Sequence, residues 1–234
     1  MRLKRKNKLV SGVGINDADY EVQKYAVVSG KRKRIWVCPY YNVWKSMITR
    51  CYSRVYQSRQ PTYKNCTVCN EWLTFSNFKK WMEQQDHKGK YLDKDVLSAG
   101  NSVYSSEHCV FVTRNVNNFV TEGNHGKRPY LIGVCFLVNK KSNSYQSQCK
   151  NPFNQRTRGH LGYYSSEIQA HLAWKSRKRE LAIQLANSEY VTDERVAQAL
   201  INRYQGDGVY IDAVNNNIPV EEFLLNREQY LSKV

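Results

Sequence analysis

Apolar residues recur every three or four positions between Pro39 and Met82, which is the spacing of one face of an α-helix. The run "YNVWKSMITRCY" carries one apolar face, and "NEWLTFSNFKKWM" carries a second that is rich in aromatic residues. Large aromatic side chains are most often core residues. The pattern therefore predicts two helices that turn their aromatic faces into a core.

The pattern changes at residue 90, where short apolar runs are separated by a long polar loop. The run "VFVT" at 110–113 is typical of a short β-strand. Thr113 is a suitable N-cap for a helix through "RNVNNFV". Residues 90–119 are therefore predicted to fold as strand, long loop, strand and helix.

A polar, glycine-rich stretch, "GNHGKRP", is the clearest domain boundary in the chain. Three strand-like runs follow it, and "SSEIQAHLAWKSRKRELAIQLA" then has the apolar stripe of a long helix. The expected fold class is α+β, with the order strand–strand–strand–helix over 130–186. The expected divisions are a basic N-terminal segment (1–36), a first domain (37–122, with its core at 90–122), a linker (123–129), a second domain (130–187) and a helical C-terminal appendage (188–234).

The charge of the chain narrows the choice of partner, because 36 Lys and Arg outnumber 20 Asp and Glu for a net charge of +16. Cations at this density favour a polyanion, since each phosphate that is neutralised releases a counterion. The sharpest cluster is "GKRKR", where Arg32 and Arg34 are expected to contact phosphates, with a solvated loop as the alternative. No apolar run reaches the roughly 20 residues that span a membrane, and no secretory signal is recognisable. We expect a soluble, cytoplasmic protein without a membrane partner.

The stretch "KYLDKDVLSAGNSVYSSEHCVFVTRNVNNF" resembles the HNH endonucleases, particularly the phage-type homing endonucleases. Its "LDK" at 92–94 matches the first strand of the family motif, "GN" at 100–101 matches the loop, and "EHCVFVT" at 107–113 matches the second strand. Asn117 falls at the position of the metal-binding Asn on the following helix. The resemblance implies a ββα-metal core that hydrolyses phosphodiester bonds in double-stranded DNA.

The resemblance implies that Asp93 and Asn117 hold one divalent cation, Mg²⁺ or Mn²⁺, which stabilises charge on the scissile phosphate. Lys94 stands where the family has its catalytic His. Strand alternation would place Asp93 and Asp95 on one face with Lys94 pointing away, so Asp95 is a candidate ligand or base. His108 is a candidate replacement for the imidazole, or else a partly exposed loop histidine. A hairpin whose Asp and Asn residues only form turns is the structural alternative.

Residues 130–186 are similar to the APETALA-type (ethylene-response-factor) DNA-binding domain, through "GV" at 133–134 and "HLGYYSS" at 160–166. In that family the sheet enters the major groove. Cys135 and Leu137 stand in place of its Arg-type readers, so contacts from the first strand are not expected. The positions expected to contact DNA are Gln148 and Lys150 on the second strand, Arg158 and His160 on the third, and Lys140 and Lys141 in the hairpin loop.

The seven cysteines point to reduced thiols or a metal site, because the chain has no recognisable export signal. Cys66 and Cys69 have the two-residue spacing of a zinc knuckle, and Cys51 and Cys109 are candidates to complete a structural Zn²⁺ site. Buried reduced thiols are the alternative.

Taken with the charge, the two resemblances predict a homing endonuclease of the HNH type that acts in an infected bacterial cell. The alternative is a non-catalytic DNA-binding regulator or interaction protein derived from a degenerate HNH nuclease. A protein directed to RNA is a third possibility, because the basic charge and the 17 tyrosines suit RNA equally well.

Overall fold

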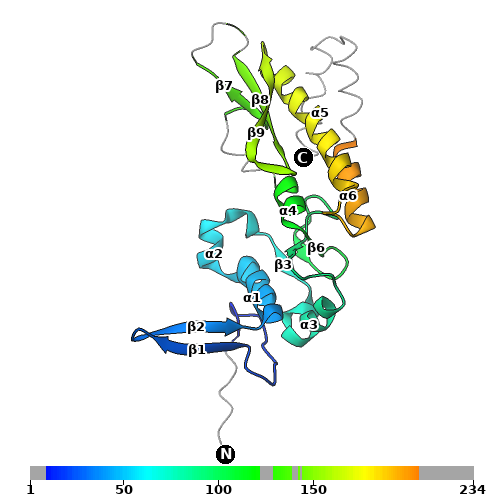
Figure 1. Cartoon of the computed structure of the whole chain (residues 1–234). Helices are drawn as coiled ribbons and strands as arrows, with labels where there is room; N and C mark the ends of the chain where they lie inside the picture. The colour runs from blue at the N-terminus through cyan, green and yellow to red at the C-terminus, as the bar shows by residue number, and fades with distance from the viewer. Residues whose placement is uncertain (1–8, 122–128, 139–141, 143, 206–234) are drawn as a thin grey trace, which may run out of the picture. The chain divides into compact units, whose positions relative to one another are not determined.

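A computed structural model describes residues 9–121, 129–138, 142 and 144–205 (Figure 1). The chain forms two compact units, Met1–Phe111 and Val112–Val234. Both units combine helices with small sheets, so the expected α+β class is confirmed. The expected linker lies almost wholly outside the described residues, which resume at Pro129. No helix among the described residues is long and apolar enough to cross a membrane.

The first unit begins with an antiparallel hairpin of β1 (Gln23–Val28) and β2 (Lys31–Val37). Its two-residue turn has positive φ at both Ser29 (51°) and Gly30 (71°), which matches the right-handed twist of hairpin strands. The prediction for this segment was a basic tail or loop. Alternation was hard to recognise here because almost every residue of both strands is exposed.

The helical part of the first unit contains the predicted aromatic core. Trp44 is fully buried, and its Nε1 donates a hydrogen bond of 2.7 Å to the carbonyl of Trp72. The first predicted helix forms as expected, but the second divides at Thr74, whose backbone is extended. The elements are α1 (Pro39–Tyr52), α2 (Arg54–Arg59), η1 (Pro61–Tyr63), β3 (Thr67–Val68), η2 (Asn70–Leu73) and α3 (Phe75–Glu83).

The segment after α3 contains three short strands, β4 (Tyr91–Asp93), β5 (Val103–Tyr104) and β6 (Val110–Val112). β4 and β6 form a two-stranded sheet, as predicted, and α4 (Arg114–Val120) follows β6 with Thr113 as its N-cap. β5 was not predicted. It pairs in parallel with β3 and so attaches the long loop to the helical core.

The second unit contains the predicted order of three strands and a helix. β7 (Val134–Phe136), β8 (Tyr145–Asn151) and β9 (Asn154–Tyr164) form an antiparallel sheet in that order. α5 (Glu167–Ala186) follows and packs on the sheet, and α6 (Glu194–Gln205) packs on α5. Gly133 allows the close approach of α5, because a Cβ there would lie 2.2 Å from Cγ of Trp174, and its φ is +79°.

A buried lysine connects two helices of the second unit. Lys178 on α5 donates a hydrogen bond of 2.5 Å to the carbonyl of Phe119, near the end of α4. Its ammonium also lies 3.8 Å from the centre of the Phe119 ring. A buried ammonium needs such partners to offset the loss of hydration.

Candidate functional site

Asp93 is the last residue of β4, and its carboxylate shapes the turn that follows. Its Oδ1 accepts hydrogen bonds from the backbone N–H groups of Asp95 (2.7 Å) and Val96 (2.8 Å). Burial raises the pKa of Asp93 above its ordinary value, although these two N–H donors act in the opposite direction. The carboxyl group of Asp93 therefore stabilises the turn.

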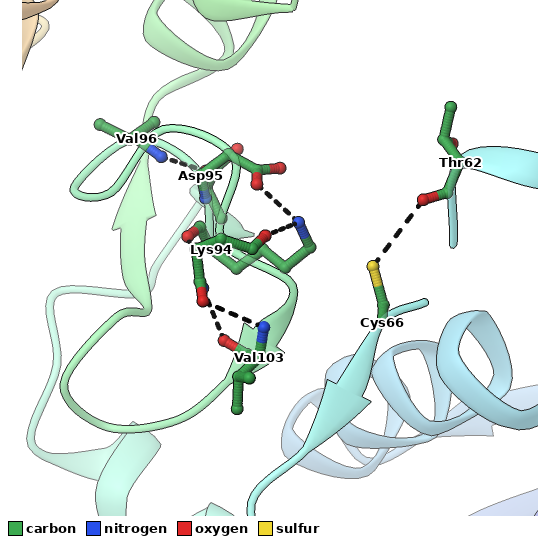
Figure 2. Close-up of polar contacts among 8 residues, drawn as sticks. Thr62, Cys66, Lys94, Asp95, Val96 and Val103 are labelled. Atoms are coloured by element: carbon green, nitrogen blue, oxygen red, sulfur yellow. Dashed lines mark hydrogen bonds and ion pairs between the residues drawn. The ribbon is translucent and has the colours of Figure 1, made fainter. Parts of the chain in front are cut away.

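Lys94 does not point away from Asp95, as strand alternation had predicted. β4 ends at Asp93, so alternation does not extend to these residues. The Nζ of Lys94 donates to Oδ1 of Asp95 (2.6 Å) and to the carbonyl of Asn101 (2.5 Å) (Figure 2). Lys94 is buried, whereas the Asp95 side chain is 44% exposed. Asp95 is thus paired with a lysine instead of forming a carboxylate pair with Asp93.

Asn101 closes the loop between β4 and β5. Its Nδ2 donates to the carbonyls of Lys94 (3.0 Å) and Val103 (2.7 Å), and its Oδ1 accepts from the Val103 N–H (3.1 Å). Lys94 and Asn101 therefore bond to each other's backbone carbonyl groups. Gly100, with a φ of +77°, makes the turn that brings Asn101 into place. The "GN" pair of the loop has an evident structural role.

His108 and Asn117 lie in different units. His108 is half-buried just before β6, and its Nδ1 is 2.9 Å from Oγ of the buried Ser105. That contact fixes one edge of the imidazole ring. Asn117 is in the middle of α4, where its carbonyl accepts hydrogen bonds from the N–H and Oγ1 of Thr121. Asp93, Asp95 and His108 thus belong to the first unit, and Asn117 belongs to the second.

Among the described residues, no group of three or more His, Cys, Asp or Glu side chains is arranged to hold a metal ion. The ligand set that the HNH resemblance implies is smaller than such a group, because it consists of one carboxylate, Asp93, and one amide, Asn117. Mg²⁺ typically keeps several water ligands and takes one or two carboxylates. The residue types would fit such a cation, with water and phosphate filling most of its ligand positions.

The four cysteines considered for zinc are free thiols, and Cys69 is the only one of them that is not fully buried. Burial raises the pKa of all four thiols, and that of Cys51 reaches about 12. The Sγ of Cys66 lies 3.9 Å from the carbonyl of Thr62, to which its S–H can donate (Figure 2). Zinc binds the thiolate form, so these surroundings favour reduced thiols, and the zinc site stays a prediction.

Three residues of the expected DNA-binding set lie on one face of the β7–β8–β9 sheet. Gln148 and Lys150 alternate along β8 with the buried Ser147 and Cys149. Since α5 packs on the sheet and buries one face of it, Gln148 and Lys150 belong to the opposite, accessible face. His160 on β9 is exposed and pairs in register with Gln148.

Arg158 pairs in register with Lys150, which assigns it by backbone position to the same face; its side chain is not described. Lys140 and Lys141 lie outside the described residues. Two residues that the sequence reasoning missed also belong to this face. The Nε2 of Gln146 is 3.0 Å from Nδ1 of His160, and the ring of Tyr163 lies 4.6 Å from the His160 ring. Extending the alternation of β8 by one step would have found Gln146.

Arg32 and Arg34 both lie on β2, opposite Val27 and Tyr25 of β1, and therefore share one face of the hairpin. The guanidinium carbon of Arg32 is 4.4 Å from the centre of the Tyr25 ring. Both arginines are exposed. The two arginines predicted to contact phosphates thus lie on a β-strand, not in a loop.

A scan against protein-family models, a search of curated proteins and a search of solved structures each found no match to this chain.

Proposed function

We propose that the protein is a DNA endonuclease of the HNH type, which binds double-stranded DNA and hydrolyses a phosphodiester bond with one divalent cation. The observation that carries the proposal is the order of elements around Asp93. β4 pairs with β6 and α4 follows directly, with Asp93 at the end of β4 and Asn117 on α4. This is the order that the family resemblance implies.

Asp93 and Asn117 would hold the cation, which would stabilise negative charge on the phosphate undergoing hydrolysis. Burial raises the pKa of Asp93, and a cation held there would favour its ionised form. His108 is the proposed base, because Ser105 orients its ring. Lys94 is a poor candidate for the base, because its ammonium is bonded to two acceptors.

The accessible face of the β7–β8–β9 sheet is the proposed DNA-binding surface of the second unit. Gln148 has the amide that pairs with adenine in the major groove, and Lys150 suits a phosphate or guanine. His160 and Tyr163 extend the same face with a ring pair. The net charge of +16 supports a nucleic-acid partner.

The test is cleavage of long duplex DNA with Mg²⁺ or Mn²⁺, with and without EDTA, by wild type and Asp93→Asn. An Asn at 93 keeps an oxygen that can accept from the N–H groups of Asp95 and Val96, but it lacks the charge. We expect Asp93→Asn to bind DNA as wild type does and to cut at least 100-fold more slowly, which is the usual scale for a lost electrostatic contribution to catalysis. Cleavage by Asp93→Asn at the wild-type rate would show that the charge of Asp93 is not needed for catalysis, which would contradict its proposed role.

A second candidate function is DNA binding without cleavage. Lys94 stands at the position of the family's catalytic His, and its ammonium is bonded to Asp95 and to the Asn101 carbonyl. These contacts hold the loop and favour the second function. The same assay separates the two functions, because a non-catalytic protein binds DNA and leaves it uncut with either metal.

A further inference from the structure

The β1–β2 hairpin combines positive charge, aromatic rings and exposure in a way that core packing does not explain. Residues 23–37 contain five cations and no acidic residue. The exposed fractions of its large apolar side chains are also high, at 74% for Val27, 60% for Ile35 and 45% for Tyr25. The cations are Lys24, Lys31, Arg32, Lys33 and Arg34.

The base of the hairpin is firmly attached to the first unit. Val22 and Cys38, which flank the two strands, are both buried in the core, and the Cys38 N–H donates to the Val22 carbonyl at 2.9 Å. α1 begins at the next residue, Pro39. A two-stranded hairpin is at best marginally stable alone. The anchored base therefore holds a ribbon whose two faces are available to a partner, and Figure 1 shows it extending from the helices of its unit.

The two faces of the ribbon carry different cations. Tyr25, Val27, Arg32 and Arg34 share one face by register, and Lys31 and Lys33 lie on the other with Ala26 and Val28. The Arg32–Tyr25 contact restricts the guanidinium before any partner binds. A restricted arginine loses less side-chain entropy on binding than a free lysine does.

We propose that the β1–β2 hairpin is a DNA-binding arm that enters a groove of the duplex with its arginine face toward the DNA. The major groove admits a two-stranded ribbon. A strand as long as β2 extends roughly 20 Å at about 3.3 Å per residue, enough to reach along several base pairs. Arg32 and Arg34 contact phosphates or guanine edges. The inference rests on the proposed action on duplex DNA and adds a second contact surface to it.

The test compares three double variants of the full chain by fluorescence anisotropy with duplex DNA over a range of salt concentrations. Arg32→Gln/Arg34→Gln removes the arginine face, and Lys31→Gln/Lys33→Gln removes an equal charge from the other face. Lys64→Gln/Lys88→Gln removes the same charge from exposed positions of the same unit outside the hairpin. Circular dichroism checks that each variant is folded.

We expect Arg32→Gln/Arg34→Gln to weaken binding at least tenfold at moderate salt. It should also reduce the slope of log affinity against log salt by about 2, which is the effect of losing two phosphate contacts. The Lys31/Lys33 variant should lose less affinity for DNA, and the Lys64/Lys88 variant should bind DNA with nearly the wild-type affinity. Equal losses in all three variants, or none in the arginine variant, would overturn the proposal.

Two other candidate partners of the hairpin, a membrane surface and a second copy of the chain, are tested with the same variants. If Arg32→Gln/Arg34→Gln loses binding to anionic phosphatidylserine vesicles but keeps its DNA affinity, the hairpin binds a membrane surface and the proposal is overturned. If the same variant changes its self-association in analytical ultracentrifugation but keeps its DNA affinity, the hairpin binds a second copy of the chain and the proposal is overturned. If wild type binds and cuts DNA but the arginine variant behaves like wild type, the inference fails and the proposed function stands. If wild type does not bind DNA, both fail.

Discussion

The loop after β4 and the accessible face of the β7–β8–β9 sheet are both rich in polar residues, but they use these residues differently. In the loop, Asp93, Lys94 and Asn101 bond mainly to nearby backbone groups. On the sheet, Lys150 and His160 are exposed. Polar groups that bond to their own backbone maintain a conformation, whereas polar groups that face solvent remain available to a partner. Residue type alone does not separate the two cases.

The largest expected effect on stability comes from Lys94→Met. The substitution leaves the Asn101 carbonyl without its lysine donor and separates Asp95 from its cation. We expect the free energy of unfolding to fall by about 2 kcal/mol, the usual cost of an unsatisfied buried polar group. Urea unfolding measures the change. As a control, Lys79→Met removes a surface pair with Glu83 and should cost about 0.5 kcal/mol or less. Equal effects of the two substitutions would show that the buried contacts of Lys94 stabilise the fold no more than a surface ion pair does.

A smaller effect is expected in the pH dependence of stability. Because burial raises the pKa of Asp93, the folded protein binds more protons than the unfolded chain between about pH 4 and that raised pKa. The free energy of unfolding contributed by Asp93 therefore falls as the pH rises through this window. Asp93→Asn does not titrate, so the stability of wild type relative to this variant should fall over the same window.

Urea unfolding of wild type and Asp93→Asn across pH, with and without Mg²⁺, measures this difference in stability. A cation bound by Asp93 would lower the pKa of its carboxyl group and remove the fall. A relative stability that rises with pH in the absence of metal would contradict the effect assigned to burial.

The smallest effect on stability is expected on the sheet. Gln148→Ala and Lys150→Gln should each change the free energy of unfolding by no more than about 0.5 kcal/mol, because these side chains are not part of the core. In DNA binding, Lys150→Gln should reduce the salt slope by about 1. Gln148→Ala should mainly reduce sequence discrimination, by about 1–3 kcal/mol. A large loss of stability in either variant would show that this face is structural, like the loop.

Regular patterns made much of the fold predictable. The apolar spacing located α1 and α5, and the turn residues between strand-like runs gave the order of the second unit. The β1–β2 hairpin was missed because neither of its faces is buried, which removes the alternation that reveals a strand. β5 was missed because a two-residue strand depends on its distant partner, β3.

The candidate site was predicted less well, because its geometry depends on where β4 ends. A strand that continued for two more residues would have aligned Asp93 with Asp95. Instead the carboxylate of Asp93 accepts from the N–H of Asp95 and begins a turn. The role of Asn101 depends on contacts with Lys94, seven residues away, for which no local pattern exists. Gln148, Lys150 and His160 were named through the family resemblance. They lie on a shared face because alternation holds along β8 and His160 lies opposite Gln148, although the register shifts between Ser147 and Gln148.

The close approach of Gly133 to Trp174 limits how this chain can diverge. A Cβ at position 133 would lie 2.2 Å from Cγ and 2.6 Å from Cβ of Trp174, so a smaller residue at 174 would still clash through its own Cβ. The positive φ of Gly133 also disfavours most other residues there. Any residue other than glycine at 133 therefore requires the backbone of α5 to move away from the sheet. Related chains should keep glycine at 133 even where the tryptophan at 174 has been lost.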